Sequence, residues 1–268
     1  MSGTICFVSD FGLEDTWVGV CHAVIYRDCP TAHVVDLAHQ IPPFDIRKGA
    51  AVTAAGVHQL PQAIHLTVVD PGVGGARADL CLVTAQGTRL IGPDNGVLMP
   101  AAVRAGGVAA AFEIDASAFT GGPPLSTFHA RDVLAPAAAA IACGREPASL
   151  GRSVEPARLA PAPFGPARVE GDHVLTEVVD IDRFGSVRLG IGAEDLETMG
   201  LRSGAFELSF GHTLLEVPFA RTFADVEPGE PVALVDSSGW LTLAINTRSA
   251  AERYGIEPGV SARLRALD

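Results

Sequence analysis

The chain has 268 residues, of which 48% are hydrophobic and 19% are charged, so it can bury a sizeable core and is not expected to be disordered. It carries 19 Lys and Arg against 31 Asp and Glu, a formal net charge of −12. This balance argues against nucleic acid or an anionic membrane surface as the main partner, and it is compatible with a cationic small molecule.

The cysteines and the apolar segments indicate the class of protein. Five cysteines are an odd number and contain no C-x-x-C pair, which disfavours a disulfide framework and a structural zinc site. A strand-like run already begins at Thr4, so no signal peptide is expected. The longest apolar stretch, residues 133–143, contains Pro136 and is too short to span a membrane. We therefore expect a soluble cytoplasmic protein that does not bind membranes.

The first half of the chain alternates strand-like and helix-like segments. Apolar, β-rich runs predict strands at 4–9, 32–37, 64–69, 80–84 and 89–91. Helical spacing or an Ala-rich composition predicts helices at 15–28, 46–60, 96–104 and 131–143. Asp15 is placed to cap the first helix, and residues 80–91 resemble a hairpin around Gln86 and Gly87. This alternation indicates βαβ units, so residues 1–154 are predicted to form an α/β domain with a largely parallel sheet that carries the catalytic residues.

The composition changes after residue 154. Residues 155–168 contain four prolines and no clear hydrophobic period, which is typical of a linker. Short strand-like runs follow at 173–179, 186–189, 206–210, 213–217, 232–235, 240–245 and 261–264, with one predicted helix at 248–254. We therefore predict that residues 169–268 form a small antiparallel β-barrel domain.

Polar turns follow three of the predicted strands, at residues 9–12, 36–39 and 70–77. Each alone is typical of an ordinary turn, but ligands of open α/β sheets bind beyond the carboxyl ends of strands, so three such turns together indicate a site. The glycines of the third turn allow backbone N–H groups to point inward, as in an anion nest, although the turn lacks the G-K-[S/T] ending of a P-loop. Arg77 closes this turn and would keep Asp70 ionised.

His129 stands immediately before the predicted Ala-rich helix. The helix dipole favours the neutral imidazole there, which can act as a base near neutral pH, although a His in this position can also simply cap the helix. The sequence contains no G-x-S-x-G motif, which argues against a serine hydrolase. Asp36 and His39 could bind a metal together with Asp10 and Asp15, but their spacing matches no standard ligand set, so no metal site is predicted.

Several longer motifs occur in order along the chain. They are SDFG at 9–12, VDLAHQIPPFDI at 35–46, VVDPGVGGAR at 68–77, GPDNGVL at 92–98, STFHARD at 126–132, VDIDRFGSV at 179–187, TFADV at 222–226 and SSGWL at 237–241. In this combination the chain resembles the S-adenosylmethionine (SAM) hydrolase family, the SAM hydroxide adenosyltransferases, which are related to the bacterial fluorinase and chlorinase. The resemblance covers essentially the whole chain.

The resemblance implies an N-terminal α/β domain, a C-terminal β-barrel and a homotrimer whose active sites lie between one subunit's N-terminal domain and its neighbour's C-terminal domain. It implies a water-activating catalytic set, which falls on Asp70, Arg77 and His129. It implies substrate-binding residues at Asp10 for the ribose hydroxyls, Phe44 and Phe223 beside the nucleoside, Asp15, Asp182 and Ser237 near the methionine portion, and Ser186, Asn246 and Thr247 near adenine. SAM is the implied substrate, with no further cofactor and no metal.

The sequence departs from the family pattern at a few positions. Ala130 follows the histidine where glycine is common, and Ser186 replaces an asparagine. Ser238 stands where the fluorinase has an arginine for the methionine carboxylate. The tyrosine and threonine of the fluorinase halide site are absent from residues 70–77, which favours water over a halide as the nucleophile.

We therefore predict hydrolysis of SAM to adenosine and L-methionine by attack of activated water on the 5′ carbon. The sulfonium is a good leaving group, so the difficulty lies in the nucleophile. Arg77 and loop N–H groups would stabilise developing hydroxide, while Asp70 or His129 accepts the proton. Three alternatives remain open: a SAM-dependent halogenase that forms 5′-halo-adenosine, a non-enzymatic SAM- or adenosine-binding protein, and a metal-dependent phosphohydrolase built on Asp10, Asp36 and His39.

Overall fold

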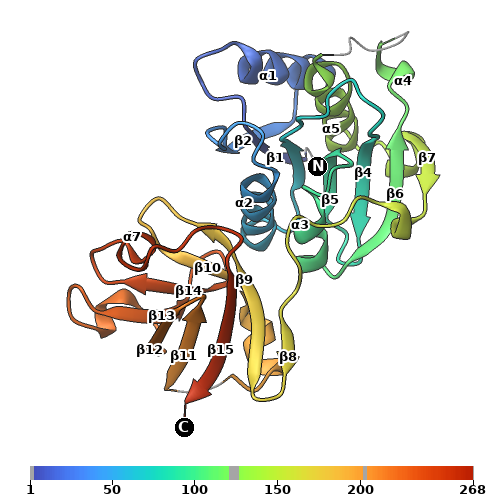
Figure 1. Cartoon of the computed structure of the whole chain (residues 1–268). Helices are drawn as coiled ribbons and strands as arrows, with labels where there is room; N and C mark the ends of the chain where they lie inside the picture. The colour runs from blue at the N-terminus through green and yellow to red at the C-terminus, as the bar shows by residue number, and fades with distance from the viewer. Residues whose placement is uncertain (1–2, 121–126, 202–203, 268) are drawn as a thin grey trace. The chain divides into compact units, whose positions relative to one another are not determined.

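The computed structural model describes residues 3–120, 127–201 and 204–267. The chain divides into two compact units, Met1–Pro163 and Phe164–Asp268, so that the boundary falls inside the proline-rich stretch 155–168 (Figure 1). Each unit is described by itself below.

The first unit is built on a seven-stranded sheet with strand order β2-β1-β3-β5-β4-β6-β7. Its strands are β1 Thr4–Ser9, β2 His33–Ala38, β3 Ile64–Val68, β4 Asp79–Thr84, β5 Arg89–Pro93, β6 Val108–Ile114 and β7 Gly151–Val154. Its helices are α1 Trp17–Asp28, α2 Ile46–Gln59, α3 Met99–Arg104, α4 Ser117–Thr120, α5 Ala135–Ala142, the π-helix η1 Ala130–Leu134, and the 3-10 helices η2 Pro147–Ser149 and η3 Pro156–Arg158.

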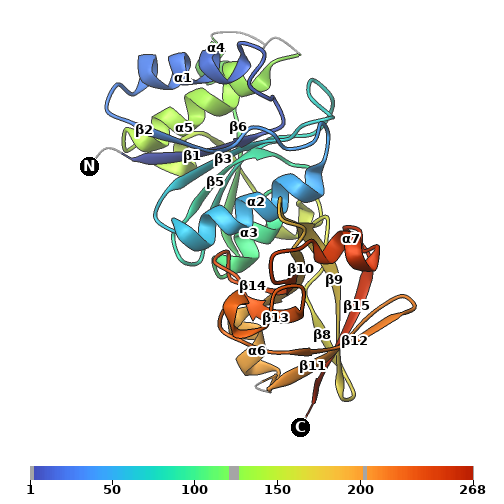
Figure 2. The same cartoon turned by 90° about the vertical axis from the view of Figure 1, so that its left-hand side faces the viewer.

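Helices cover both faces of this sheet, with α1 and α5 on one face and α2 and α3 on the other (Figure 2). Strands β2, β1, β3 and β5 pair in parallel, whereas β4, β6 and β7 join antiparallel. Every residue of β3 is buried, as expected for a parallel strand with a helix layer on each side. The predicted α/β fold and the predicted hairpin, observed as β4 and β5, are both confirmed.

The structure corrects two local predictions in this unit and adds two strands. The first helix begins at Trp17 and its N-cap is Thr16 without a side-chain bond, so the prediction that Asp15 caps it is wrong. The predicted helix 131–143 is divided into η1 and α5. Pro136 has no N–H to donate to the preceding turn, and the N–H of Ala135 donates to the carbonyl of Ala130, five residues back, as in a π-helix. Strands β6 and β7 were not predicted, since the alanines of β6 carry little β signal.

The second unit is an antiparallel sheet with strand order β12-β11-β15-β9-β10-β14-β13, and β8 pairs with β9 beside this path. Its strands are β8 Arg168–Glu170, β9 His173–Ile181, β10 Val187–Gly192, β11 Ala205–Phe210, β12 Thr213–Pro218, β13 Pro231–Val235, β14 Trp240–Ile245 and β15 Ser261–Leu267. Its helices are α6 Ala193–Thr198, α7 Ala250–Tyr254 and the 3-10 helix η4 Phe223–Asp225.

This second sheet curls into a nearly closed barrel. Its two outer strands approach through the segment after β12, where Phe219 bridges Ala233 and the N–H of Ala220 donates to the Ala233 carbonyl at 2.9 Å. Alternate residues of β11 are buried, including Phe206 and Leu208 in the barrel core. The predicted β-barrel is confirmed, although α6 was not foreseen.

Within the described segments, no helix is both long enough and apolar enough to cross a bilayer.

One disulfide contradicts the interpretation drawn from the cysteine count. Cys29, at the end of α1, is bonded to Cys143, at the end of α5, with their Cα atoms 5.8 Å apart and 114 positions apart in sequence. Helices α1 and α5 pack side by side on one face of the sheet (Figure 2), and the bond joins the residues that directly follow the two helices. A long-range pairing of this kind depends on tertiary packing and leaves no spacing motif.

Replacing Cys143 with serine should lower the free energy of unfolding by about 2–5 kcal/mol, because the bond closes a long loop in the unfolded chain. Urea denaturation without reductant measures this difference. Dithiothreitol should destabilise the wild type and leave the Cys143→Ser variant unchanged. Equal urea midpoints for both proteins would show that the bond contributes nothing.

A buried histidine makes the first unit sensitive to acid. His65 lies in β3 with no exposed surface, and its Nε2–H donates to the Leu60 carbonyl at 3.0 Å. Burial lowers the pKa of His65 from its ordinary value. The unfolded chain therefore binds this proton at a higher pH than the folded chain, so stability should fall as the pH drops below about 6.5, by at most about 1.4 kcal/mol per pH unit.

The His65→Gln variant keeps a donor for Leu60 and removes the titration. We expect its unfolding free energy to depend less on pH than that of the wild type between about pH 7.5 and 5.0. Identical pH dependences in urea denaturation would contradict the assignment.

Candidate active site

The loop that follows the central strand β3 carries the first candidate residues. Asp70 begins two successive turns, in which the N–H of Val73 donates to the Asp70 carbonyl at 3.2 Å and the N–H of Gly75 donates to the Gly72 carbonyl at 3.0 Å. These two amides are therefore engaged within the loop and do not form the inward-facing anion nest that the glycines suggested.

Arg77 closes the loop and binds two carboxylates. Its Nε donates to Asp70 Oδ1 at 3.0 Å and one terminal nitrogen donates to Asp70 Oδ2, a bidentate pair. Its other terminal nitrogen donates to Asp79 Oδ1 at the start of β4. The side chains of Asp70, Arg77 and Asp79 are only 5%, 10% and 6% exposed, so the arrangement is held away from water.

His129 joins the same network through Asp79. Its Nδ1 lies 2.7 Å from Asp79 Oδ2, and the imidazole is 13% exposed. An ionised carboxylate can only accept, so Nδ1 carries the proton and Nε2 is left as a lone pair that can take one. The structure thus brings the three predicted catalytic residues together in one chain of contacts, Asp70–Arg77–Asp79–His129.

Asp79 is the member of this network that sequence analysis missed. It lies nine residues after Asp70 and is the first residue of β4, where an acidic residue is typical of an ordinary strand boundary. The one signal available was its position two residues after Arg77, which in an extended chain places both side chains on the same side.

A cavity of about 930 Å³ lies in the first unit, with Asp70 and His129 in its wall. Asp10 and Phe44 also line it, and so do three aromatic residues that sequence analysis did not single out: Phe11, Trp17 and Phe128. The Phe11 ring meets Trp17 and Phe128 edge to face, with ring centroids 5.9 and 6.0 Å apart. The cavity therefore combines an aromatic surface with carboxylate and imidazole groups and the guanidinium of Arg131, as expected of a pocket for a planar ligand with polar substituents.

Asp10 holds the neighbouring loop in an uncommon conformation. Its Oδ2 accepts the N–H of Phe44 at 2.9 Å, and Phe44 has a φ of 69°. Phe44 and Thr247 are the two non-glycine residues with positive φ among those the structure describes, and both belong to the predicted substrate-binding set. Such a conformation costs on the order of 1–3 kcal/mol and is typical of ligand-binding positions.

Asp15 and the STFHARD motif are the remaining predictions for the first unit, and only the motif contributes residues to the cavity wall. Asp15 is exposed and is not one of the residues that line the cavity. Ser126 of the STFHARD motif lies outside the described residues. His129 and Ala130 of the same motif both line the cavity.

In the second unit, most of the predicted residues gather at one end of the barrel. Asp182 Oδ1 accepts the N–H groups of Phe184 and Ser186 and so shapes the turn between β9 and β10. The carbonyl of Gly185 in this turn accepts the N–H of Ala251 in α7, which follows shortly after Asn246 and Thr247. The Asn246 side chain in turn donates to the carbonyl of Val226, directly after η4, the helix that begins at Phe223.

Ser237 is the exception in the second unit. It lies in the turn before β14, whereas Asn246 and Thr247 follow the same strand. The six residues of β14 span about 20 Å, so Ser237 before the strand and the pair after it lie far apart within one chain. The resemblance places Ser237 and this pair at different ends of the substrate.

The free cysteines are unsuited to act as nucleophiles. Cys6, Cys21 and Cys81 are buried, and burial raises their pKa values to about 11, 12 and 12. A thiol with such a pKa carries almost no thiolate at neutral pH.

Comparison with known proteins decides the family. The model of the SAM hydroxide adenosyltransferase N-terminal domain matches residues 5–151, and that of the C-terminal domain matches residues 176–263. The chain belongs to the SAM hydroxide adenosyltransferase family. The predicted resemblance is therefore confirmed.

Relatives within and beside this SAM hydroxide adenosyltransferase family match nearly the full chain. A protein of Salinispora tropica named (R)-S-adenosyl-L-methionine hydrolase is 43% identical over 264 residues, which cover 98% of this chain and 97% of the relative. A protein of the same name from Thermus thermophilus is 39% identical, with 97% and 98% covered. A fluorinase of Nocardia brasiliensis is more distant, at 28% identity with 97% and 96% covered.

Two solved structures share the fold of this chain. An uncharacterized conserved protein from Thermotoga maritima superposes with a TM-score of 0.88 at 30% identity, covering 97% of this chain and 99% of that one. A conserved hypothetical protein from Thermus thermophilus gives a TM-score of 0.76 at 37% identity, with 98% and 99% covered.

Proposed function

We propose that the chain is an S-adenosyl-L-methionine hydrolase that forms adenosine and L-methionine. The observation that carries the proposal is the cavity wall in which Asp70 and His129 are joined through Arg77 and Asp79. The hydrolase name of relatives up to 43% identical over nearly the full chain supports it.

The proposed reaction is a displacement at the 5′ carbon of the ribose. The oxygen of water forms a bond to this carbon, the bond from carbon to sulfur breaks, and sulfur takes the bonding pair and leaves as the neutral thioether of methionine. Water gives up one proton in this step. Because the leaving group needs no acid, the site has only to orient the water, align it opposite the sulfur and accept the proton.

The geometry suggests a separate role for each residue of the network. Asp70 lies in the cavity wall with its carboxylate fixed by the Arg77 fork, and it would accept a hydrogen bond from the attacking water. His129 would take the proton at Nε2, since Asp79 holds the proton on Nδ1 and orients the ring.

Arg77 itself does not line the cavity, and three of its N–H groups already serve Asp70 and Asp79. We therefore assign it a positioning role instead of the direct contact with developing hydroxide that the sequence suggested.

Charge supports a cationic substrate at this place. Two carboxylates and one guanidinium give Asp70, Arg77 and Asp79 a combined charge of −1 when His129 is neutral. An unbalanced negative charge in a buried wall attracts a sulfonium more strongly than it would in water. Asp10 would bind the ribose hydroxyls with the carboxylate oxygen that Phe44 does not use.

The remaining parts of the proposal rest on family resemblance. Phe44 would stack on the nucleoside, Asp15 would attract the methionine ammonium group, and the second unit would contribute Asp182, Ser186, Phe223, Ser237, Asn246 and Thr247. These second-unit residues would serve the site of a neighbouring subunit in a homotrimer. No cofactor or metal is needed for the displacement, and no nucleic acid is expected as a partner.

A cytoplasmic location is also proposed, and the disulfide bears on it. Cytosolic thiol pools keep most protein cysteines reduced. Cys29 and Cys143 would therefore be thiols in that compartment, and the bond would form once the protein is in an oxidising solution.

Product analysis tests the proposed activity. Purified protein incubated with SAM at neutral pH should release adenosine and methionine in equal amounts, measured by liquid chromatography. The absence of both products over hours at micromolar enzyme would overturn the proposal. Tight binding in calorimetry without product would indicate a binding protein instead, and 5′-halo-adenosine formed only with added halide would indicate a halogenase.

A further inference from the structure

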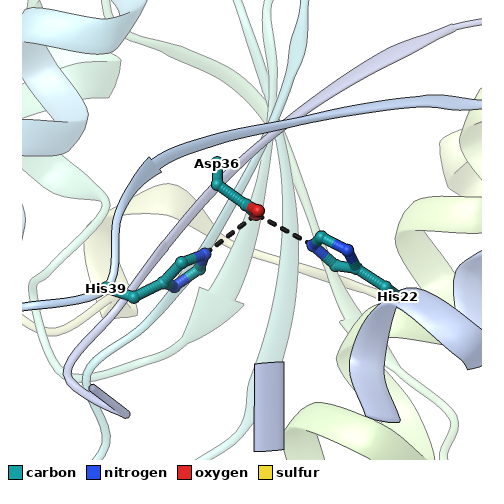
Figure 3. A group of neighbouring side chains, drawn as sticks. All are labelled: His22, Asp36 and His39. Carbon is teal, nitrogen blue, oxygen red and sulfur yellow. Dashed lines mark hydrogen bonds and ion pairs between the residues drawn. The ribbon is translucent and has the colours of Figure 1, made fainter. Parts of the chain in front are cut away.

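Two histidines and an aspartate meet outside the residues that line the cavity. His22 comes from α1, Asp36 from β2 and His39 from the turn after β2. The Nε2 atoms of both histidines lie 2.8 Å from the same oxygen, Asp36 Oδ1, and the rings approach it from opposite sides (Figure 3). The three potential ligand atoms all lie within 4.8 Å of one another.

Surrounding residues hold the two rings in place. His39 is buried and its Nδ1 lies 2.7 Å from Ser9 Oγ, on the far side of the ring from Asp36. The ring of Phe7, which has no exposed surface, lies against both imidazoles, with centroids 4.7 Å from His39 and 6.3 Å from His22. The site is therefore preorganised and backed by an apolar wall.

We propose that His22, Asp36 and His39 bind a divalent transition-metal cation of the zinc class. Two imidazoles and one carboxylate are a common zinc donor set, whereas magnesium and calcium prefer oxygen ligands alone. With metal–ligand distances of about 2.0–2.2 Å, the ligand atoms of a tetrahedral zinc lie roughly 3.3 Å apart. The observed 2.8 Å separations therefore need to open by only about half an ångström.

The hydrogen bonds around the cluster suit both the empty and the loaded state. Without metal, the Ser9 hydroxyl donates to His39 Nδ1 and His39 Nε2–H donates to Asp36. With metal, Nε2 becomes the ligand, the proton resides on Nδ1, and the same hydroxyl accepts it. Both ring nitrogens of His39 therefore have a partner in either state.

The cluster is open to solvent on one side. Asp36 and His22 are 41% and 25% exposed, which gives a cation access from solvent. Three protein ligands leave a fourth position open for water.

The proposed cation site is linked to the loop of Asp10. The N–H of Gly12 donates to the His39 carbonyl at 2.7 Å, and Ser9 directly precedes Asp10. The metal therefore stabilises the segment that presents Asp10 to the cavity, without taking part in the displacement itself.

Cobalt(II) titration of metal-free, tag-free protein tests this site without any activity assay. We expect one equivalent per chain, visible absorption of tetrahedral cobalt, and its loss on addition of zinc(II). His22→Gln removes a partly exposed ligand and should weaken binding at least tenfold. Ser9→Ala removes the partner of His39 Nδ1 and should weaken it about 10–100-fold.

His173→Gln is the matched control, because His173 also pairs with a carboxylate, Asp172 at 2.6 Å, but no third ligand joins this pair among the residues that the structure describes. It should bind cobalt as the wild type does. Absence of stoichiometric binding by the wild type, or binding by His22→Gln with unchanged affinity, would show that the three residues form only a hydrogen-bonded cluster. Calorimetry with zinc(II) on the same variants gives a second readout of the same result.

Discussion

Replacing Asp70 with asparagine should lower kcat for SAM hydrolysis by about 10²–10⁴-fold, with a much smaller change in KM. The asparagine preserves the size of the side chain but removes the charge that Arg77 fixes in the cavity wall. The neutral amide also accepts a weaker hydrogen bond from the attacking water than the carboxylate does. Steady-state kinetics with chromatographic detection of adenosine measures both constants.

Asp115→Asn is the matched control for this variant, because Asp115 is an exposed carboxylate whose side-chain partner within the described residues is Ser117. It should retain wild-type kcat and KM. A rise in KM without loss of kcat in Asp70→Asn would indicate that Asp70 binds substrate and does not assist the chemical step.

Replacing Arg77 with methionine should reduce both stability and activity. It leaves the carboxylates of Asp70 and Asp79 buried without their cation, and breaking a buried pair in this way costs about 3–5 kcal/mol. Misplacement of Asp70 should lower kcat by about 10²-fold or more. Urea denaturation and steady-state kinetics measure the two effects separately.

The Arg77→Met/Asp79→Asn double variant separates the two effects. Removing the charge of Asp79 should recover part of the lost stability. It should recover none of the activity, because Asp70 still lacks the hydrogen bonds from Arg77 and His129 loses the carboxylate that orients it. Activity that returns together with stability would mean that Arg77 acts only through folding.

The main elements of the first unit could be predicted because local composition determines them. The apolar run of β3 and the glycine-rich turn after it placed Asp70 at the carboxyl edge of the sheet, where ligands of such sheets bind. Arg77 closes the same turn, so its pairing with Asp70 is a short-range contact that the sequence could suggest. His129 could be placed at the start of a helix for the same reason.

Other parts of the structure depend on contacts between distant segments, which leave no local pattern. Asp79 acquires its role only when His129, 50 residues later, lies 2.7 Å away. The bond between Cys29 and Cys143 depends on how α1 packs against α5. His22 joins Asp36 and His39 in place of Asp10 and Asp15, which the sequence analysis had weighed as further ligands, because α1 turns one imidazole toward β2 (Figure 3).

Hydrolysis in water enriched in oxygen-18 tests the central claim most directly. If water bound by Asp70 and His129 attacks the 5′ carbon, mass spectrometry should find the label in the 5′-hydroxyl of adenosine and none in methionine. Unlabelled adenosine would show that the oxygen does not come from water and would contradict the account. Label that enters at the same rate in the Asp70→Asn variant would contradict the role of this network.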